Sequence, residues 1–294
     1  MINLFKHMER MQAMEPEVRA WWAIRHTPEG RAVAAQSQET FSRMSVARGG
    51  GANPYLFTRQ DHSAKTAHNA DVTDKAEQIV QYMLPHSLSG LINICVWSTK
   101  GCRATCLHTS GRLRLAEIAK FVRVELFVVD PFAYMVVMLT EIERHIRRIA
   151  KCGKITVVRP NGTGDIPWEM LGFLFDLVAS LEMGATWFDY TKGILTKSAR
   201  KRTASPRPDY YTVASAVEAT TAETIAGYLQ NVVTVVNVRR SQPLPETMWG
   251  RPVIDGDRHD LRLFDPQIAA LVLVRAKGDA RKAPAGDREF VKAV

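Results

Sequence analysis

The sequence predicts an α/β protein: a parallel (β/α) barrel of the TIM type, partial or complete, behind an N-terminal helical extension. Strand-like apolar runs alternate with helix-like stretches through most of the chain, which is typical of βαβ units. Some runs, such as Val232–Val236, are apolar almost throughout, as expected of strands buried on both faces. Hydrophobic residues make up 46% of the 294 residues, which is enough for a packed core.

The first 50 residues are expected to form the helical extension. Met8, Met11, Val18 and Trp21 recur at helical spacing, and Gly49–Gly51 ends the pattern. Residues 51–84 are predicted to be a linker followed by a helix from Lys75 to Met83, and residues 85–294 to be the barrel domain.

Six strands and three main helices are expected in the barrel domain. The strands are predicted at Leu91–Val96, Lys154–Arg159, Thr186–Tyr190, Tyr210–Ala214, Val232–Val238 and Ala269–Arg275. The helices are predicted at Pro131–Ile149, Trp168–Leu181 and Thr221–Leu229. Pro131–Ile149 is strongly amphipathic, with apolar side chains on one face and charged side chains on the other.

The charge of the chain indicates a polyanionic partner. The net charge is +9 and the isoelectric point is about 9.5, which favours a nucleotide or nucleic acid. A basic run follows the third predicted strand and could contact phosphate, or could be a solvated loop; its candidates are Lys197, Arg200, Lys201 and Arg202. No apolar run approaches the roughly 18 residues of a membrane span, and no signal peptide is evident, so we expect a cytoplasmic protein.

Three cysteines lie within twelve residues, at Cys95, Cys102 and Cys106. Thiolates bind iron and zinc because they are soft, anionic donors. Three cysteines without an evident fourth ligand suit a 4Fe–4S cluster with one iron open. A zinc site completed by His108 and a loop without metal are the alternatives.

A second group of polar residues follows the predicted strand ends. Gly162 and Gly164 would let the backbone approach a ligand, with Asp165 as an acceptor, although a plain turn capped by Asp165 is also possible. In a parallel barrel the carboxyl ends of the strands converge on the active site. Candidates at the later strand ends are Asp189, Lys192, Ser215, Asn237 and Lys277.

Several motifs together resemble a phage family called gene product 88, over about residues 85–294. They are Ser87–Gly90, Cys95–Arg112, Asn161–Glu169, Phe188–Lys192, Val253–Asp257 and Ala276–Gly278. The resemblance implies a phage or prophage origin, and it brings no activity with it.

The order of the motifs also resembles radical S-adenosylmethionine enzymes, which place a three-cysteine loop after the first barrel strand and a glycine-rich turn after the second. That resemblance implies a cluster on the three cysteines. It implies that Gly162, Gly164 and Asp165 approach the methionyl amine of S-adenosylmethionine, and that Ser215 and Asn237 contact the rest of it. The cysteine spacing here is longer than the usual C-x3-C-x2-C, and Asp165 stands in place of a glutamate.

The leading hypothesis is therefore an iron–sulfur barrel enzyme that uses S-adenosylmethionine on a nucleotide or nucleic acid, with Asp165, Asp189, Lys192 and Lys277 as candidate catalytic residues. A second hypothesis is base exchange in DNA, because phage enzymes resembling tRNA-guanine transglycosylases use two carboxylates, here Asp165 and Asp189. A third is a non-enzymatic, basic nucleic-acid-binding protein with a structural zinc.

Overall fold

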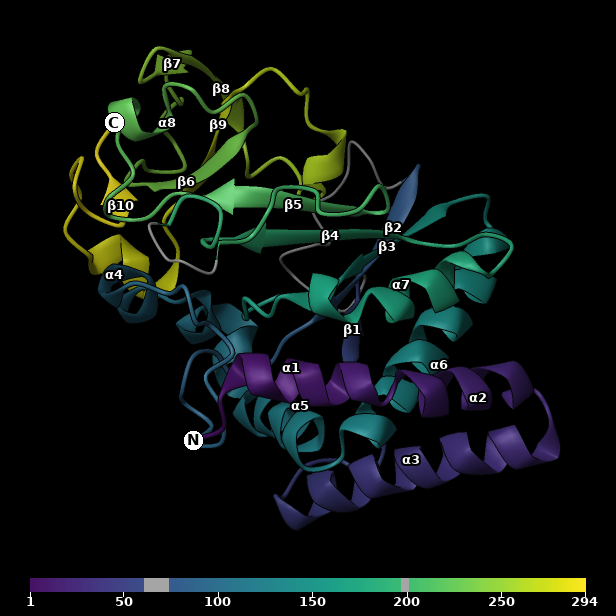
Figure 1. Ribbon diagram of the computed structural model, residues 1–294. Helices are drawn as coiled ribbons and strands as arrows, with labels where there is room; N and C mark the ends of the chain where they lie inside the picture. Colours follow the sequence, from purple (N-terminus) through teal and green to yellow (C-terminus); the bar gives the residue numbers. More distant parts are fainter. Residues whose placement is uncertain (61–73, 197–200) are drawn as a thin grey trace. The chain divides into compact units, whose positions relative to one another are not determined.

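A computed structural model describes residues 1–60, 74–196 and 201–294 (Figure 1). The chain divides into two compact units. The first unit comprises residues 1–60, 75–96 and 116–187, and the described part of the second comprises residues 74, 97–115, 188–196 and 201–294. Strand β4 contributes its first residues to the first unit and the remainder to the second.

The first unit begins with three helices, α1 (Leu4–Ala13), α2 (Glu15–Ile24) and α3 (Pro28–Ala47) (Figure 1). The side chains of Asn3 and Thr27 cap α1 and α3, each by accepting a backbone N–H of the first turn. The residues at helical spacing are buried, including Met8, Met11, Val18, Trp21 and Trp22. The predicted N-terminal helical segment is thus confirmed as helical, and its tryptophans pack within the first unit.

The first unit also holds the strands β1 (Phe57–Arg59), β2 (Ala76–Gln81), β3 (Ile155–Arg159) and the start of β4 (Thr186–Thr191). β1 is antiparallel to β2, whereas β2, β3 and β4 run parallel. The helices of this unit are α5 (Glu117–Val129), α6 (Pro131–Ala150) and α7 (Gly172–Ala179), the last preceded by the 3-10 turn η4 (Trp168–Leu171). Tyr134 of α6 hydrogen-bonds Gln81 of β2, which holds the amphipathic helix on the sheet.

Two predicted elements of the first unit are wrong. Residues 75–83 do not form a helix but contain β2, a strand that pairs with β1 on one side and β3 on the other. Residues 91–96 do not form a strand. Ile92 forms one isolated β-bridge with Ile2. Ile79 and Val80 of the first segment and Ile92 and Ile94 of the second are buried, so burial alone does not distinguish a strand from a loop that packs on the sheet.

The second unit holds the end of β4 and most of the later strands. These are β5 (Tyr210–Ser215), β6 (Val232–Val236), β7 (Thr247–Met248), β8 (Arg251–Asp255), β9 (Leu271–Arg275) and β10 (Val291–Lys292). Their order is β4-β5-β6-β9-β8-β7, with β10 also beside β6. Its short helices are α4 (Lys100–Ala104), η2 (Leu107–Thr109), η3 (Gly111–Leu115), α8 (Ala222–Ile225), η5 (Arg262–Phe264) and η6 (Gly278–Lys282).

The predicted α/β class with a mostly parallel sheet is confirmed. β1 with β2 and β7 with β8 are antiparallel, whereas β2–β3, β3–β4, β5–β6, β6–β9, β6–β10 and β8–β9 are parallel. β1 and β7 stand at the two ends of the strand order, so the ladder of the described strands is not closed. None of the helices within residues 1–60, 74–196 and 201–294 is long and apolar enough to cross a membrane. The domain boundaries at residues 50 and 84 remain predictions.

Candidate functional site

In the first unit, Cys95 lies against the glycine-containing turn that follows β3. Its thiol is 3.6 Å from the carbonyl oxygen of Thr163, and its sulfur accepts the backbone N–H of His86 at 3.2 Å. Cys95 itself is buried. Residues that follow β2 and β3, two parallel neighbours, therefore meet at the carboxyl ends of these strands.

The turn of residues 161–165 owes its glycines to close packing within the chain. The N–H of Gly162 donates to the carbonyl of Gln81 at 2.7 Å, and a Cβ on Gly162 would lie 2.6 Å from that same oxygen. Asn161 closes the turn by accepting from, and donating to, the backbone of Ile166. Asp165 is buried, and its N–H donates to the carbonyl of Ile94. The turn is therefore a rigid element that holds Asp165 beside the segment that carries Cys95.

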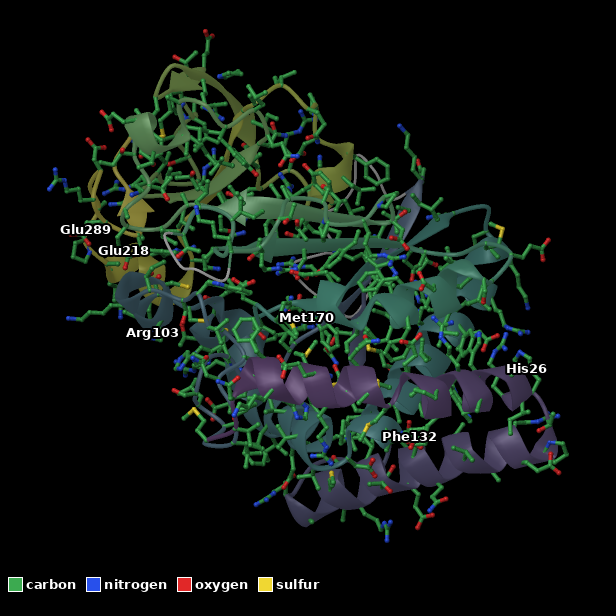
Figure 2. All side chains as sticks on the ribbon, viewed as in Figure 1. His26, Arg103, Phe132, Met170, Glu218 and Glu289 are labelled. Carbon is green, nitrogen blue, oxygen red and sulfur yellow. The ribbon has the colours of Figure 1, made fainter. Side chains whose placement is uncertain are left out.

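Cys102 and Cys106 belong to the second unit and are both half-buried. The side chain of Thr99 accepts the N–H of Cys102 at 3.1 Å, and Cys106 precedes η2. The carboxylate of Glu218, which follows β5, accepts the N–H of Gly101 at 2.6 Å; Glu218 is labelled in Figure 2. These contacts anchor the cysteine-bearing turn α4 beside the carboxyl end of β5.

The three free thiols of Cys95, Cys102 and Cys106 are donors of the kind that bind iron or zinc. No group of three or more His, Cys, Asp or Glu side chains that could hold a metal is found within the described residues. Each unit positions its own thiols firmly, Cys95 in the first and Cys102 and Cys106 in the second. The iron–sulfur and zinc assignments both stay predictions.

Asp189 lies in a buried cluster of the second unit, together with Tyr210 and Arg202. The Tyr210 hydroxyl donates to Asp189 at 3.0 Å and accepts from the Arg202 guanidinium at 2.9 Å. Arg202 is also 3.6 Å from the Asp189 carboxylate and lies over the ring of Trp97 at 5.9 Å. The basic run thus ends in a buried arginine that neutralises a buried carboxylate.

The other predicted residues of the second unit have diverse surroundings. Lys277 forms an ion pair with Asp257 at 2.8 Å; burial acts to raise the pKa of Asp257, but the hydrogen bonds and charges of Lys277 and Arg275 hold it below its ordinary value. Ser215 and Lys192 are half-buried, while Asn237 is exposed. Lys201 is exposed, and the predictions at Lys197 and Arg200 lie outside the described residues.

Comparison with known proteins agrees with the motifs. A family model described as Gene product 88 matches residues 55–293. The chain belongs to the Gene product 88 family. No curated protein and no solved structure matches it. The match begins after α3, so the three N-terminal helices lie outside the part of the chain that defines the family.

One buried polar residue of this Gene product 88 chain was missed by sequence reasoning. Gln78, in the middle of β2, is 0% exposed, and neither its amide oxygen nor its amide nitrogen has a hydrogen-bond partner among the described residues. A buried amide without partners is costly. A polar residue in the middle of a buried strand could have pointed to Gln78, but the sequence pattern of residues 75–83 predicts a helix instead of a strand.

Proposed function

We propose that this Gene product 88 protein is an iron–sulfur enzyme of phage or prophage origin that uses S-adenosylmethionine to modify a nucleotide or nucleic acid in the host cytoplasm. Cys95, Cys102 and Cys106 would hold a 4Fe–4S cluster, with zinc as the alternative metal. The parallel strands would form a partial barrel, and the site would lie at their carboxyl ends.

The observation that carries this proposal is the meeting of two motifs in the first unit. Cys95 comes from the segment after β2, and the turn with Gly162 and Gly164 comes directly after β3. The 3.6 Å contact between the Cys95 thiol and Thr163 brings a potential cluster ligand onto that turn. The resemblance to radical S-adenosylmethionine enzymes leads us to expect this same juxtaposition after successive parallel strands.

The residues of the first unit would bind and orient the cofactor. When bound, a 4Fe–4S cluster with one open iron supplies a one-electron reductant beside S-adenosylmethionine. Asp165 is buried next to the Cys95 segment, where its carboxylate would accept hydrogen bonds from the methionyl amine. Because Asn161 locks the turn through Ile166, that carboxylate would be positioned before any cofactor binds.

Anaerobic purification followed by iron, sulfide and zinc analysis tests the proposal. We expect about four irons and four sulfides per chain, with the broad visible absorbance of a cluster. Cys102→Ser and Cys106→Ser should each lose the iron. Cys152→Ser is the matched control, because Cys152 is exposed and lies outside the loop. A colourless protein with stoichiometric zinc, or iron that persists in both loop variants, would contradict a cluster at these residues.

The base-exchange hypothesis comes second, because Asp189 is already engaged. Its carboxylate accepts from Tyr210 and faces Arg202 inside the protein, whereas a nucleophile needs access to its substrate. Asp165→Asn should abolish base exchange if this hypothesis is right. The third hypothesis, nucleic-acid binding with a structural zinc, predicts salt-sensitive binding with no small cofactor.

A further inference from the structure

Six exposed basic side chains of the second unit lie on three loops. We call this set the basic rim: Arg112, Arg114, Arg239, Arg240, Arg281 and Lys282. The first two belong to η3, the next two follow β6, and the last two belong to η6. The last two loops follow the carboxyl ends of β6 and β9, and the first follows the segment that carries Cys102 and Cys106.

Direct contacts hold the three loops side by side. β6 and β9 are parallel neighbours with Val236 opposite Arg275, and the N–H of Ala276 donates to Val236 at 2.9 Å. The segments that leave these two strands are therefore adjacent. Arg275 also donates to the carbonyl of Gln242, which ties the turn after Arg240 to β9.

The third loop is joined through a glycine. η2 packs against η6, and Gly278 meets Ser110 so closely that a Cβ there would lie 2.1 Å from the serine hydroxyl oxygen. Gly278 has φ +56°, a left-handed conformation that favours glycine. Because η3 directly follows Ser110 in the chain, η3 begins next to Gly278, the first residue of η6.

The charges of the rim are not compensated. Within residues 1–60, 74–196 and 201–294, none of the six side chains forms an ion pair. Two cations nearby differ in this respect, because Arg275 pairs with Asp255 and Lys277 pairs with Asp257. η6 itself carries one exposed carboxylate, Asp279. A surface that pairs some of its cations and leaves six neighbours unpaired attracts an extended polyanion.

We infer that the basic rim binds the sugar–phosphate backbone of a nucleic acid. Five of the six residues are arginines, whose planar guanidinium groups bind phosphate through two hydrogen bonds at once. The rim spans three loops, which suits a chain of phosphates better than a single nucleotide. This inference rests on the proposed function for the identity of the substrate and narrows it from a nucleotide or nucleic acid to a nucleic acid.

The rim adds exposed cations to the nucleic-acid contact predicted at residues 197–202. The basic run of residues 197–202 was the candidate from the sequence, but its last residue, Arg202, is buried against Asp189 and Tyr210. The six rim residues are exposed, and among the described residues none of them pairs with a carboxylate; Arg281 donates to the carbonyl of Ala276.

Fluorescence anisotropy with a labelled 20-nucleotide DNA, single-stranded and duplex, tests the inference on the full chain purified in air. We compare the wild type, Arg239→Ala/Arg240→Ala, and a control, Arg31→Ala/Arg43→Ala, which removes two exposed arginines from α3. The rim variant should bind about tenfold more weakly at 100 mM salt. Its plot of log affinity against log salt should flatten by about 1.5, since each lost phosphate contact contributes about 0.7–0.9.

The control variant should bind DNA as tightly as the wild type does. It also loses two positive charges, but they lie on α3 and not on the basic rim. A second variant, Gly278→Ala, should weaken binding by displacing η6 without removing any charge. Equal losses in the rim and control variants, no DNA binding at low salt, or binding only to vesicles of anionic lipid would each overturn the inference. The binding assay uses protein without added iron. A metal analysis that finds no cluster would therefore reject the proposed iron–sulfur enzyme, but the DNA-binding result could still be interpreted.

Discussion

Glu141→Gln should change how the stability of this protein depends on pH. Glu141 lies on α6 and is buried, and its two carboxylate oxygens accept the N–H groups of Leu56 and Phe57 at 2.9 and 3.0 Å. These bonds fasten the segment that leads into β1 to α6. Burial raises the pKa of Glu141 from 4.5 to about 7, and the two N–H bonds and the charge of Arg123 offset only part of that rise.

The raised pKa determines the direction in which stability changes with pH. The stabilisation from the protonated carboxyl is complete below pH 4.5 and is lost as the pH rises through about 7. At 1.36 kcal/mol for each pKa unit, the whole effect is about 3 kcal/mol, and most of it falls between pH 5 and pH 8. Glutamine cannot ionise, but it replaces one acceptor by a donor and should cost about 1–2 kcal/mol at every pH.

Urea denaturation at pH 5 and pH 8 measures this difference. At pH 5 the variant should be less stable than the wild type, and at pH 8 it should be equally or more stable. Glu39→Gln is the control, because Glu39 is an exposed residue of α3. Parallel pH profiles for the wild type and Glu141→Gln would show that Glu141 is ionised throughout and would refute the reasoning.

Two further substitutions test packing and the buried cluster. Gly162→Ala should destabilise by about 1–3 kcal/mol in urea denaturation, since the new methyl would lie 2.6 Å from the Gln81 carbonyl oxygen. Gly227→Ala, which meets open space, should be neutral or slightly stabilising. Tyr210→Phe should cost about 1–3 kcal/mol by removing the hydroxyl between a buried carboxylate and a buried guanidinium. Tyr211→Phe, which loses one exposed hydrogen bond, should stay within about 0.5 kcal/mol of the wild type; equal losses at both tyrosines would contradict the cluster.

Much of the secondary structure could be predicted from local patterns. The runs that became β3, β4, β5, β6 and β9 are short, apolar and bounded by turn residues, and α6 carries an apolar stripe along its whole length. β2 was missed because Ala76–Gln81 contains strong helix formers, and its strand conformation comes from pairing with β1 and β3. Pairing with distant segments leaves no local signal.

The candidate site was only partly predictable. The sequence predicted the turn of residues 161–165 after a strand, which β3 confirms, but it placed Cys95 at the end of a strand at residues 91–96, which does not form. Cys95 reaches the turn because the segment after β2 packs against it. It could not show that Arg202 is buried, because a basic run ordinarily lies in solvent. Asp189 of β4 and Tyr210 of β5 bind this arginine inside the second unit, and the fold brings them to it.

The sequence by itself determined the α/β class, most of the element positions and the Gene product 88 motifs, because these depend on hydrophobic period and on residue spacing within short windows. The tertiary structure decided which cations are exposed, which are paired, and which thiol meets the glycine turn. Those properties depend on contacts between residues far apart in the chain, such as Gly278 with Ser110 and Cys95 with Thr163. The sequence thus named the candidate residues, and the fold determined their surroundings.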